Sequence, residues 1–585
     1  MTRIAIRPAD AKDRLFPAEM DDLLRRIYAA RGISSLEMLD LSLSRLPSPQ
    51  LMLHMDKAVS RLIDALKLGH RILIIGDFDA DGATGSALVV LGLKAMGFEF
   101  VDYLVPNRFE FGYGLTPEIV EMASERKPDL ILTVDNGVSS VEGVARARLS
   151  CIDVIVTDHH LPGKKLPDAV AIINPNQPGC QFPAKNLAGV GVAFFLLIAL
   201  RSELRDRSWF ADSRRSEPNL ASWLDLVALG TVADLVPLDH VNRILVYQGL
   251  KRIRMLKCRP GISALIHLSG KNFGRLVAAD LGFYVGPRLN AAGRLDDMSL
   301  GIQCLIAGDR QTAMELALQL NQLNQTRKAI EEQMQAEAET FLAKLDLTTS
   351  TTSNSAICLY HPDWHQGVIG LLASRIKERF QRPVIVFARD TAVSDKSQTS
   401  SNLKGSCRSV PALHMRDALE TIATQHPDLL IKFGGHAMAA GLSLDEENFE
   451  FFTKVFKKYI SEKRGDSHHD AVISTDGELT ADRLVISTAD LLHEHGPWGQ
   501  NFPEPRFSGE FILLSQQVVS ERHLKLVLRH PEGGYHNLDA IHFNMDERCW
   551  PNFDAKKVCC VYRLAINDYK GLEKLQLLVE YIKAC

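Results

Sequence analysis

Three acidic side chains follow a short apolar run near residue 75. Ile72–Ile75 is continuously apolar, ends at Gly76, and is followed by Asp77, Asp79 and Asp81. Carboxylates this close in sequence repel one another strongly unless a cation lies between them. Hard oxygen ligands favour Mg²⁺ or Mn²⁺. The stretch therefore predicts a divalent metal site. The alternative is an ordinary polar turn in which one Asp caps a helix.

Two further apolar runs end in the same way. Leu130–Val134 is followed by Asp135, and Ile152–Thr157 is followed by the Asp-His-His sequence at 158–160. A single Asp after a strand is usually a cap, and a single His is usually a satisfied polar residue. Three such endings in one sheet are harder to explain in that way. Neutral imidazole together with carboxylates is a ligand set that suits Mn²⁺.

A further carboxylate lies in an apolar segment. Leu224–Val236 is helix-like, and its only charges are Asp225 and Asp234. An Asp is costly to bury without a partner, and a metal ion would be such a partner. The alternative for each is a helix end-cap, and Asp225 fits that alternative.

A parallel sheet is needed to bring these side chains together. Continuous apolar runs bounded by glycine are typical of buried parallel strands. The carboxyl ends of such strands form the ligand-binding edge of open α/β sheets. The strands expected in this sheet are Ile72–Ile75, Phe100–Val105, Leu130–Val134 and Ile152–Thr157.

The remaining sequence predicts a strut, a second α/β lobe and a barrel. Asp309–Leu345 reads as one long polar helix, which at roughly 1.5 Å per residue could span about 50 Å. Short alternating strands in the last part of the chain fit an oligonucleotide-binding (OB) barrel, an SH3-like barrel or a sandwich. The expected fold is thus two α/β lobes with parallel sheets joined by a long helix, plus a C-terminal OB-like β-barrel. The expected ranges are 1–70 (helical segment), 71–308 (catalytic domain), 309–346 (connecting helix), 347–465 (substrate-binding α/β domain) and 466–585 (barrel).

The bulk composition narrows the class of protein. At 585 residues several domains are expected, and a net charge of −4 gives no general attraction to nucleic acid. Ten scattered cysteines form no C-x-x-C pair, which argues against a zinc site or a disulfide framework and fits a reducing cytosol. The longest apolar run, Val190–Leu200, is too short to span a bilayer, and the N-terminus lacks the apolar core of a signal peptide. We expect a cytoplasmic protein with no membrane segment.

Several loops have residue types that suit a phosphate or a nucleobase. Pro106–Gly114 carries one Arg and three aromatic side chains, which suits base stacking or, equally, packing on the core. Phe283–Arg294 is rich in small residues that let a phosphate approach closely. The Gly-Gly-His of Lys432–Gly441 can wrap a phosphate with backbone N–H groups, although a plain tight turn would look the same.

Taken in order, these motifs resemble the DHH phosphoesterase superfamily, and within it the single-strand-specific 5′→3′ DNA exonucleases. The resemblance covers nearly the whole chain. The motifs are GDFDADG (Gly76–Gly82), TVDNG (Thr133–Gly137), TDHH (Thr157–His160), GTVADLVPL (Gly230–Leu238), VGPRLNAAGR (Val285–Arg294), GSCRS (Gly405–Ser409), GGHAMAAG (Gly434–Gly441) and GPWGQNFPEPRF (Gly496–Phe507).

The resemblance implies a metal-dependent exodeoxyribonuclease with two Mn²⁺ or Mg²⁺ ions. Asp135 would bridge the ions, His160 would face the scissile phosphate, and Asp158 would orient or ligate. Many superfamily members have a His four residues before the first of the paired Asps; here Ile75 holds that place and Asp77 is the nearest candidate to replace it. The expected metal ligands are Asp77, Asp79, Asp81, Asp135, His159 and Asp234.

The resemblance also implies how the DNA is held. Ser406 and Arg408, with Arg108 across the cleft, match the positions that hold the 5′ phosphate in the family, and Arg forks suit phosphate. Arg288 and Arg294 would grip the backbone further along. The expected substrate-binding residues are Arg108, Tyr113, Arg288, Asn290, Arg294, Arg375, Ser406, Arg408 and His436.

The function expected from the resemblance is release of mononucleotides from the 5′ end of single-stranded DNA, in recombination and repair. Expected partners are single-strand-binding protein and a RecQ-like helicase, with the chain as a monomer. The rivals are a DHH hydrolase for very short RNA or cyclic dinucleotides, a manganese pyrophosphatase and a non-catalytic DNA-binding scaffold. The short-RNA hydrolases typically lack the extra barrel, and a pyrophosphatase would have no use for one because its substrate is small. A non-catalytic scaffold should have lost several metal ligands, and this chain keeps its Asp-His-His cluster.

Overall fold

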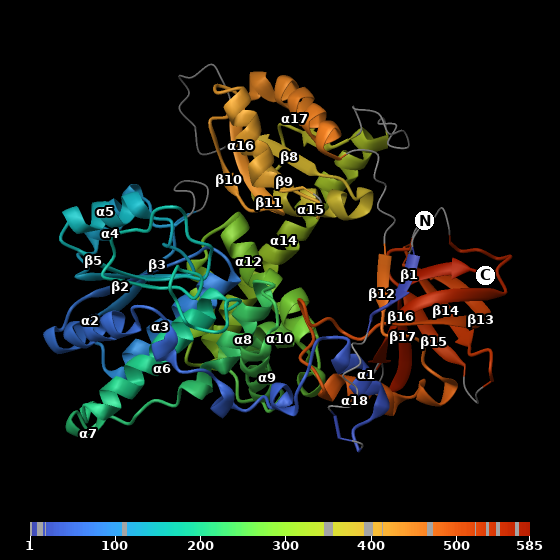
Figure 1. Ribbon diagram of the computed structural model, residues 1–585, viewed down its shortest axis with the longest axis horizontal. Helices are drawn as coiled ribbons and strands as arrows, with labels where there is room; N and C mark the ends of the chain where they lie inside the picture. Colours follow the sequence, from blue (N-terminus) through green and yellow to red (C-terminus); the bar gives the residue numbers. More distant parts are fainter. Residues whose placement is uncertain are drawn as a thin grey trace.

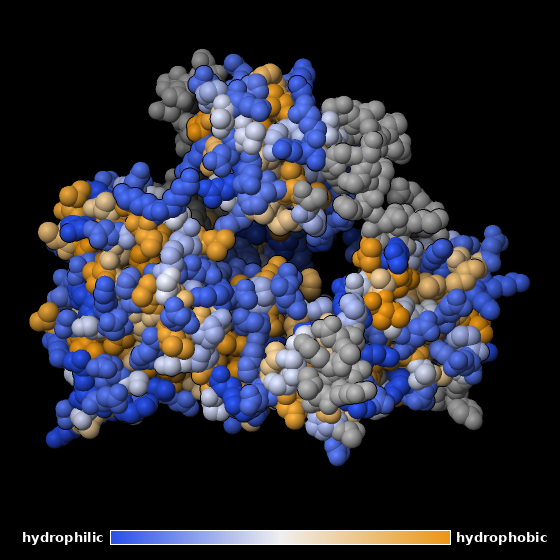
Figure 2. Space-filling model, in the orientation of Figure 1, coloured by the Kyte–Doolittle hydropathy of each residue, from blue (hydrophilic) through white to orange (hydrophobic). Residues whose placement is uncertain are grey.

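The molecule has three bodies (Figure 1), and the space-filling view shows a hollow among them (Figure 2). They are an α/β core with its helices, a second α/β lobe above it in the view, and a β-barrel to the right. Figure 2 shows hydrophilic side chains around the hollow where the second lobe faces the core. No helix in the described part of the chain is long and apolar enough to cross a membrane. The computed structural model describes residues 3–8, 16–17, 19–107, 114–343, 355–390, 402–411, 413–464, 472–520, 522–533, 537–545, 550–567 and 572–585.

The first sheet is fully parallel, in the strand order β3-β2-β4-β5-β6. Alternate residues of its strands enter two different cores: Ile74 packs on the side of α3, and Ile75 on the side of α4 and α5. Both faces are covered, which is why the strands read as unbroken apolar runs. The elements are α2 (Met55–Leu68), β2 (Ile72–Gly76), α3 (Ala80–Met96), β3 (Val101–Leu104), α4 (Pro117–Glu125), β4 (Leu130–Val134), α5 (Val141–Leu149), β5 (Asp153–Thr157) and β6 (Ala171–Ile173).

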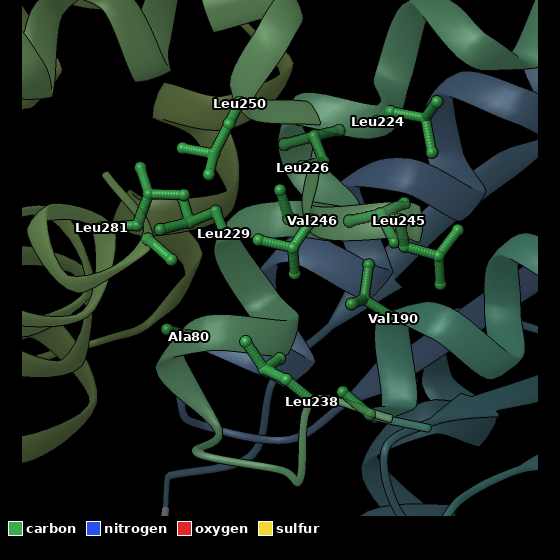
Figure 3. Packing of buried hydrophobic residues seen from close by; sticks show 14 of the residues in the cluster. Ala80, Val190, Leu224, Leu226, Leu229, Leu238, Leu245, Val246, Leu250 and Leu281 are labelled. Carbon is green, nitrogen blue, oxygen red and sulfur yellow. The ribbon is translucent and has the colours of Figure 1, made fainter. Parts of the chain in front are cut away.

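A group of helices extends this core. Helix α8 is its centre: Leu226 and Leu229 pack among side chains of α9, α3 and α6, including Leu245 and Val190 (Figure 3). The segment is apolar all round because it is buried all round. The helices are α6 (Gly189–Asp206), α7 (Trp209–Asp212), α8 (Leu224–Ala233), α9 (His240–Arg254), α10 (Pro260–Ser269), α11 (Ala278–Asp280), α12 (Gly286–Leu295) and α13 (Ser299–Ile306).

The long helix expected between the lobes is α14, Arg310–Ala343, with 34 residues. At 1.5 Å per residue it is about 51 Å long. Its first half packs on α10, α12 and α13. In its second half, Met334 and Ala338 share a core with Trp364 and Leu372 of the second lobe. One continuous helix therefore belongs to both lobes.

The second lobe has a mixed sheet, in the order β10-β11-β9-β8-β7. Only β7 and β8 are parallel, and the other pairs are antiparallel. The expectation of a parallel sheet is therefore wrong for most of this lobe, because apolar runs indicate burial but not strand direction. The elements are β7 (Ile357–Tyr360), α15 (Ile369–Phe380), β8 (Val384–Arg389), β9 (Asn402–Arg408), α16 (Met415–Gln425), β10 (Lys432–Gly435), β11 (Ala439–Asp445) and α17 (Phe449–Arg464).

The C-terminal strands form a closed barrel, β13-β14-β15-β17-β16. The expected barrel is thus confirmed, and the sandwich alternative is excluded. The N-terminal segment is not purely helical as expected: β1 (Arg3–Ile6) pairs in parallel with β12 (Val472–Thr475), beside the barrel, and α1 (Asp22–Ala29) follows. The five expected domain ranges stay predictions. The remaining elements are α18 (Ile486–Glu494), β13 (Phe507–Val519), β14 (His523–Arg529), β15 (Leu538–His542), β16 (Lys557–Asn567) and β17 (Lys574–Ala584).

Candidate metal centre and opposing phosphate pocket

The carboxyl ends of β2, β4 and β5 bring the predicted acids and histidines together. Three overlapping groups each have ligand atoms within 4.8 Å of one another. Asp135 and His159 each belong to two of the groups, and Asp135 is the residue shared by the β2 loop and the histidine pair. The groups are Asp77, Asp79 and Asp135; Asp81, His159 and Asp234; and Asp135, His159 and His160.

The loop after β2 fixes two of these carboxylates through helix ends. Asp79 Oδ1 accepts hydrogen bonds from the N–H groups of Asp81 and Gly82, at 2.9 and 3.0 Å, and so caps α3. The capping alternative and the ligand hypothesis are thus compatible. Helix α3 begins at Ala80, which places Asp81 in its first turn. The Asp81 carboxylate accepts from the N–H groups of Gly189 and Val190, where α6 begins and the helix dipole favours an anion.

Asp135 has a strained backbone in a tightly enclosed place. Its φ is 65°, a left-handed conformation that is uncommon outside glycine and often found at functional sites. A Cβ at Gly189 would lie 2.5 Å from the Asp135 Cβ, so only glycine fits there. Asp135 Oδ1 lies 3.1 Å from His159 Nε2, and that same nitrogen lies 3.5 Å from Asp234 Oδ2.

Asp158 organises the Asp-His-His turn from behind. Its Oδ1 accepts from the N–H groups of His159 and His160, and its Oδ2 accepts from the Val138 N–H. His160 Nδ1 lies 2.8 Å from the same Oδ1, and since an ionised carboxylate can only accept, Nδ1 carries the hydrogen. Asp158 belongs to none of the candidate metal groups among the described residues, so the geometry favours orienting over ligating.

The pKa values of the clustered acids indicate that their ionised forms need a positive charge nearby. Burial and neighbouring carboxylates raise the pKa of Asp81 to about 7, and they raise the pKa of Asp135 and Asp234 well above the usual range. Burial and the adjacent His160 lower the pKa of His159 to about 4, so its imidazole is neutral. Carboxylates that resist ionisation, together with a neutral imidazole, fit bound Mn²⁺ or Mg²⁺.

His160 is held differently from its neighbour. Burial alone would lower its pKa, but the hydrogen bond and charge of Asp158 outweigh burial and raise it. The opposite is true of Asp158, where burial would raise the pKa and His160 lowers it. The two residues therefore act as a pair that keeps a proton on the imidazole.

The second lobe reaches the metal centre through the turn between β10 and β11. The ring of His436 lies against that of His160, with centroids 6.3 Å apart and planes inclined by 26°. On β9, alternation places Ser406 and Arg408 on the face covered by α15, while Cys407 enters the core. The β9–β11 register pairs Arg408 with Ala439, three residues from His436. Ser406 and Arg408 therefore lie on the sheet whose β10–β11 turn carries His436.

The other predicted DNA contacts have diverse surroundings. Asn290 Oδ1 accepts from the Ala80 N–H, so it holds the metal loop. Arg294 of the core donates to the Gly367 carbonyl of the second lobe. Arg375 donates to Glu331 on α14. Arg288 donates to three acceptors, which are Asn321 Oδ1 and the carbonyls of Leu268 and Tyr284. Arg108 and Tyr113 lie outside the described residues.

Sequence reasoning missed the residues that support the site. Asn174 and Asn176 donate to the carbonyls of His160 and His159 and hold that turn. Gly189 lies at the glycine-rich start of an apolar helix. Glycine at such a position can indicate that another part of the chain packs closely against the backbone, and this signal could have identified it. Asp225 lies apart in the first turn of α8 and accepts from the N–H groups of Leu226 and Arg259; the end-cap alternative is wrong for it, because the N-cap of α8 is Trp223.

Three family models match consecutive parts of the chain. The DHH family N-terminal domain matches residues 71–231, the DHHA1 domain matches 353–462, and the RecJ OB domain matches 475–581. The order agrees with the core, the second lobe and the barrel described above.

Similar proteins cover the full length of the chain. The Single-stranded-DNA-specific exonuclease RecJ of Salmonella typhimurium is 53% identical over 98% of each chain, and that of Escherichia coli is 52% identical over 97% of this chain and 96% of its own. The crystal structure of RecJ from Thermus thermophilus in complex with Mn²⁺ covers 100% of this chain and 79% of its own, with a TM-score of 0.79 and 29% identity. A second structure of that protein is in complex with Mg²⁺.

Proposed function

The chain belongs to the RecJ family of single-stranded-DNA-specific exonucleases, a branch of the DHH phosphoesterases, and on that basis we propose that it releases mononucleotides from the 5′ end of single-stranded DNA. One observation carries the proposal: the Asp/His cluster of the core lies beside His436 of the second lobe, the lobe whose strand β9 carries the Ser406–Arg408 pair. A reacting phosphate and a chain end can thus be held together.

We assign the metal ligands to the six residues whose side chains form the cluster. Asp135 would bridge two ions because it is shared by the group of Asp77 and Asp79 and the group of His159 and His160. Asp77 would take the place of the histidine that many relatives have where this chain has Ile75. Two bound divalent ions supply charge neutralisation at the attacking and leaving oxygens of a phosphodiester and acidify water. The assigned ligands are Asp77, Asp79, Asp81, Asp135, His159 and Asp234.

The remaining residues of the cluster would act on the phosphate itself. Asp158 holds Nδ1–H of His160, which directs Nε2 away from Asp158. The raised pKa of His160 favours an imidazolium, which can donate to a phosphate oxygen where charge develops. His436 lies beside it and closes the site from the second lobe.

End recognition would come from the pocket on β9. Arg408 Nη1 donates to Ser406 Oγ at 3.2 Å, which places a guanidinium and a hydroxyl side by side. A terminal phosphate offers more charge and more acceptor oxygens than an internal diester or a 5′ hydroxyl, and Arg recognises such groups well. We therefore expect Arg408→Ala to reduce cutting of 5′-phosphorylated ends more than of 5′-hydroxyl ends.

The cellular setting is proposed on the same basis. Recombination and repair is consistent with the family, and single-strand-binding protein and a RecQ-like helicase are candidate partners of a monomeric, cytoplasmic enzyme. Every cysteine that the structure describes is free, as a reducing compartment would allow.

The test is degradation of matched oligonucleotides with Mn²⁺: single-stranded DNA, blunt duplex DNA and RNA, each labelled at the 3′ end. The proposal expects mononucleotide loss from the 5′ end of single-stranded DNA, with much slower loss from the others. Preference for RNA of two to five nucleotides would instead support the short-RNA hydrolase. Binding of DNA with no cleavage of any substrate would support the scaffold.

A further inference from the structure

Two residues of α15 shape the pocket around Arg408. Arg408 Nε donates to the Oγ of Ser374 at 3.0 Å, and its Nη1 donates to Ser406 Oγ and to the Cys407 carbonyl. Three separate acceptors thus fix one guanidinium in plane and in rotation. Ser374 is the only one of the three that comes from a different element than β9.

The direction of the hydrogen bonds through Ser374 is determined. Its hydroxyl donates to the Gly370 carbonyl one turn earlier in α15, at 3.0 Å. Since a hydroxyl has one hydrogen, its oxygen is left to accept from Arg408. A chain of bonds therefore runs from Arg408 through Ser374 to the backbone of α15.

Gly370 lies against the same groups. A Cβ there would come within 3.0 Å of Arg408 Nη2 and 3.1 Å of Ser406 Oγ. Both are polar side-chain atoms of the proposed phosphate site, and the missing Cβ lets them pack directly against α15. Ser406 Oγ accepts from Arg408, so its own hydrogen can be directed to a phosphate oxygen.

We propose that Ser374 and Gly370 set the selectivity for a 5′-terminal phosphate, Ser374 as the positioning residue that holds the Arg408 guanidinium and Gly370 as the residue whose missing side chain lets Arg408 and Ser406 lie directly against α15. The inference rests on the proposed role of Arg408 and Ser406.

The experiment compares 5′-phosphorylated and 5′-hydroxyl single-stranded DNA with Mn²⁺, measuring kcat and KM separately for Ser374→Ala, Ser374→Thr and Gly370→Ala. Loss of one hydrogen bond at Ser374→Ala should raise KM for the phosphorylated end about three- to tenfold and leave the hydroxyl end unchanged. Ser374→Thr keeps the hydroxyl and should retain the wild-type preference for the 5′-phosphorylated end. Gly370→Ala should remove the preference because its Cβ crowds Arg408 and Ser406.

Two controls separate this effect from general damage. Thr421→Ala in α16 removes a hydroxyl that makes the same bond to the carbonyl four residues earlier, at 2.8 Å, without an arginine partner, and should change neither substrate. Hydrolysis of bis(p-nitrophenyl) phosphate, which has no terminal phosphate, should stay at the wild-type rate in all variants.

The outcomes distinguish this inference from the function on which it rests. If Arg408→Ala loses the phosphate preference while Ser374→Ala and Gly370→Ala keep it, the inference is wrong and the pocket stands. If Arg408→Ala itself keeps the preference, the proposed end recognition is wrong. Equal loss on both DNA ends by Ser374→Ala would also overturn the inference, since a positioning role affects only the phosphorylated end.

Discussion

At the scale of the residue, the metal-free cluster should be sensitive to pH. In the folded chain burial and mutual repulsion raise the pKa of Asp81 to about 7 and of Asp135 and Asp234 well above the usual range, whereas in the unfolded chain these groups titrate near 3.8. Above pH 6.5 the folded chain therefore holds more protons than the unfolded chain. The raised pKa of His160 acts in the same direction.

The expected result is a fall in the free energy of unfolding of the metal-free protein as pH rises from 6.5 to 9, by about 1.4 kcal/mol per pH unit for each proton released. The window begins at 6.5 because below it the lowered pKa of His159 has the opposite effect. Urea unfolding with EDTA measures this, and saturating Mn²⁺ should abolish the dependence. A metal-free protein that gains stability over this range would contradict the electrostatic account.

Asp158 allows a second test at this scale. Asp158→Asn replaces an oxygen that accepts several N–H groups, so at least one donor would face another donor. We expect an activity loss of about 10- to 100-fold with a modest loss of Mn²⁺ affinity, as for other residues that orient metal ligands. Activity with Mn²⁺ and calorimetric titration measure the two effects. Unchanged activity would show that the orientation of His160 does not matter.

At the scale of the element, the start of α6 supports the metal centre without supplying a ligand. Gly189→Ala would place a Cβ 2.5 Å from that of Asp135 and disturb the backbone N–H that binds Asp81. Mn²⁺ affinity should fall by about 10- to 100-fold, measured by calorimetric titration. Gly308→Ala is the matched control, because no atom lies within 4 Å of its added Cβ. Equal affinity in both variants would refute the role of α6.

Elements differ in how well the sequence predicts them. Four strands of the first sheet were predictable because burial on both faces leaves continuous apolar runs, and α14 was predictable from its length and period, whereas the three-residue β6 was missed. Strand β1 was not, because its four residues pair with a strand near the other end of the chain. The mixed second sheet was missed for the reason given above.

The same division holds within the site. The sequence predicted Asp77, Asp79 and Asp81 as metal ligands, because acids crowded after a strand repel one another unless a cation lies between them. The bond between Asn290 Oδ1 and the Ala80 N–H was not, since the sequence shows a donor and an acceptor but not the partner. Supporting contacts such as that of Ser374 depend on three-dimensional proximity alone.

At the scale of the whole molecule, one buried carboxylate beside the barrel binds two arginines of the N-terminal segment. Asp476 is paired with Arg31 through two hydrogen bonds, at 2.8 and 3.0 Å, and with Arg7 at 3.2 Å. Arg31 also lies over the ring of Trp498. The barrel lies on the side of the hollow opposite the first sheet (Figure 1).

Asp476→Ala should therefore destabilise the protein by about 3–5 kcal/mol, because it leaves a buried arginine without its partner. Urea unfolding followed by a probe in the barrel and one in the core measures the change. The predicted consequence is weaker binding of long single strands with normal hydrolysis of bis(p-nitrophenyl) phosphate. A change below about 1 kcal/mol would show that the barrel is held by other contacts.

The central claim is that the acids and histidines at the end of the first sheet hold two divalent ions opposite the phosphate pocket. Anomalous diffraction from a crystal soaked in Mn²⁺ tests it most directly. The account predicts two peaks about 3.5–4 Å apart, with Asp135 between them and His159 and Asp234 in contact. A single peak, or peaks that Asp135 does not touch, would contradict it.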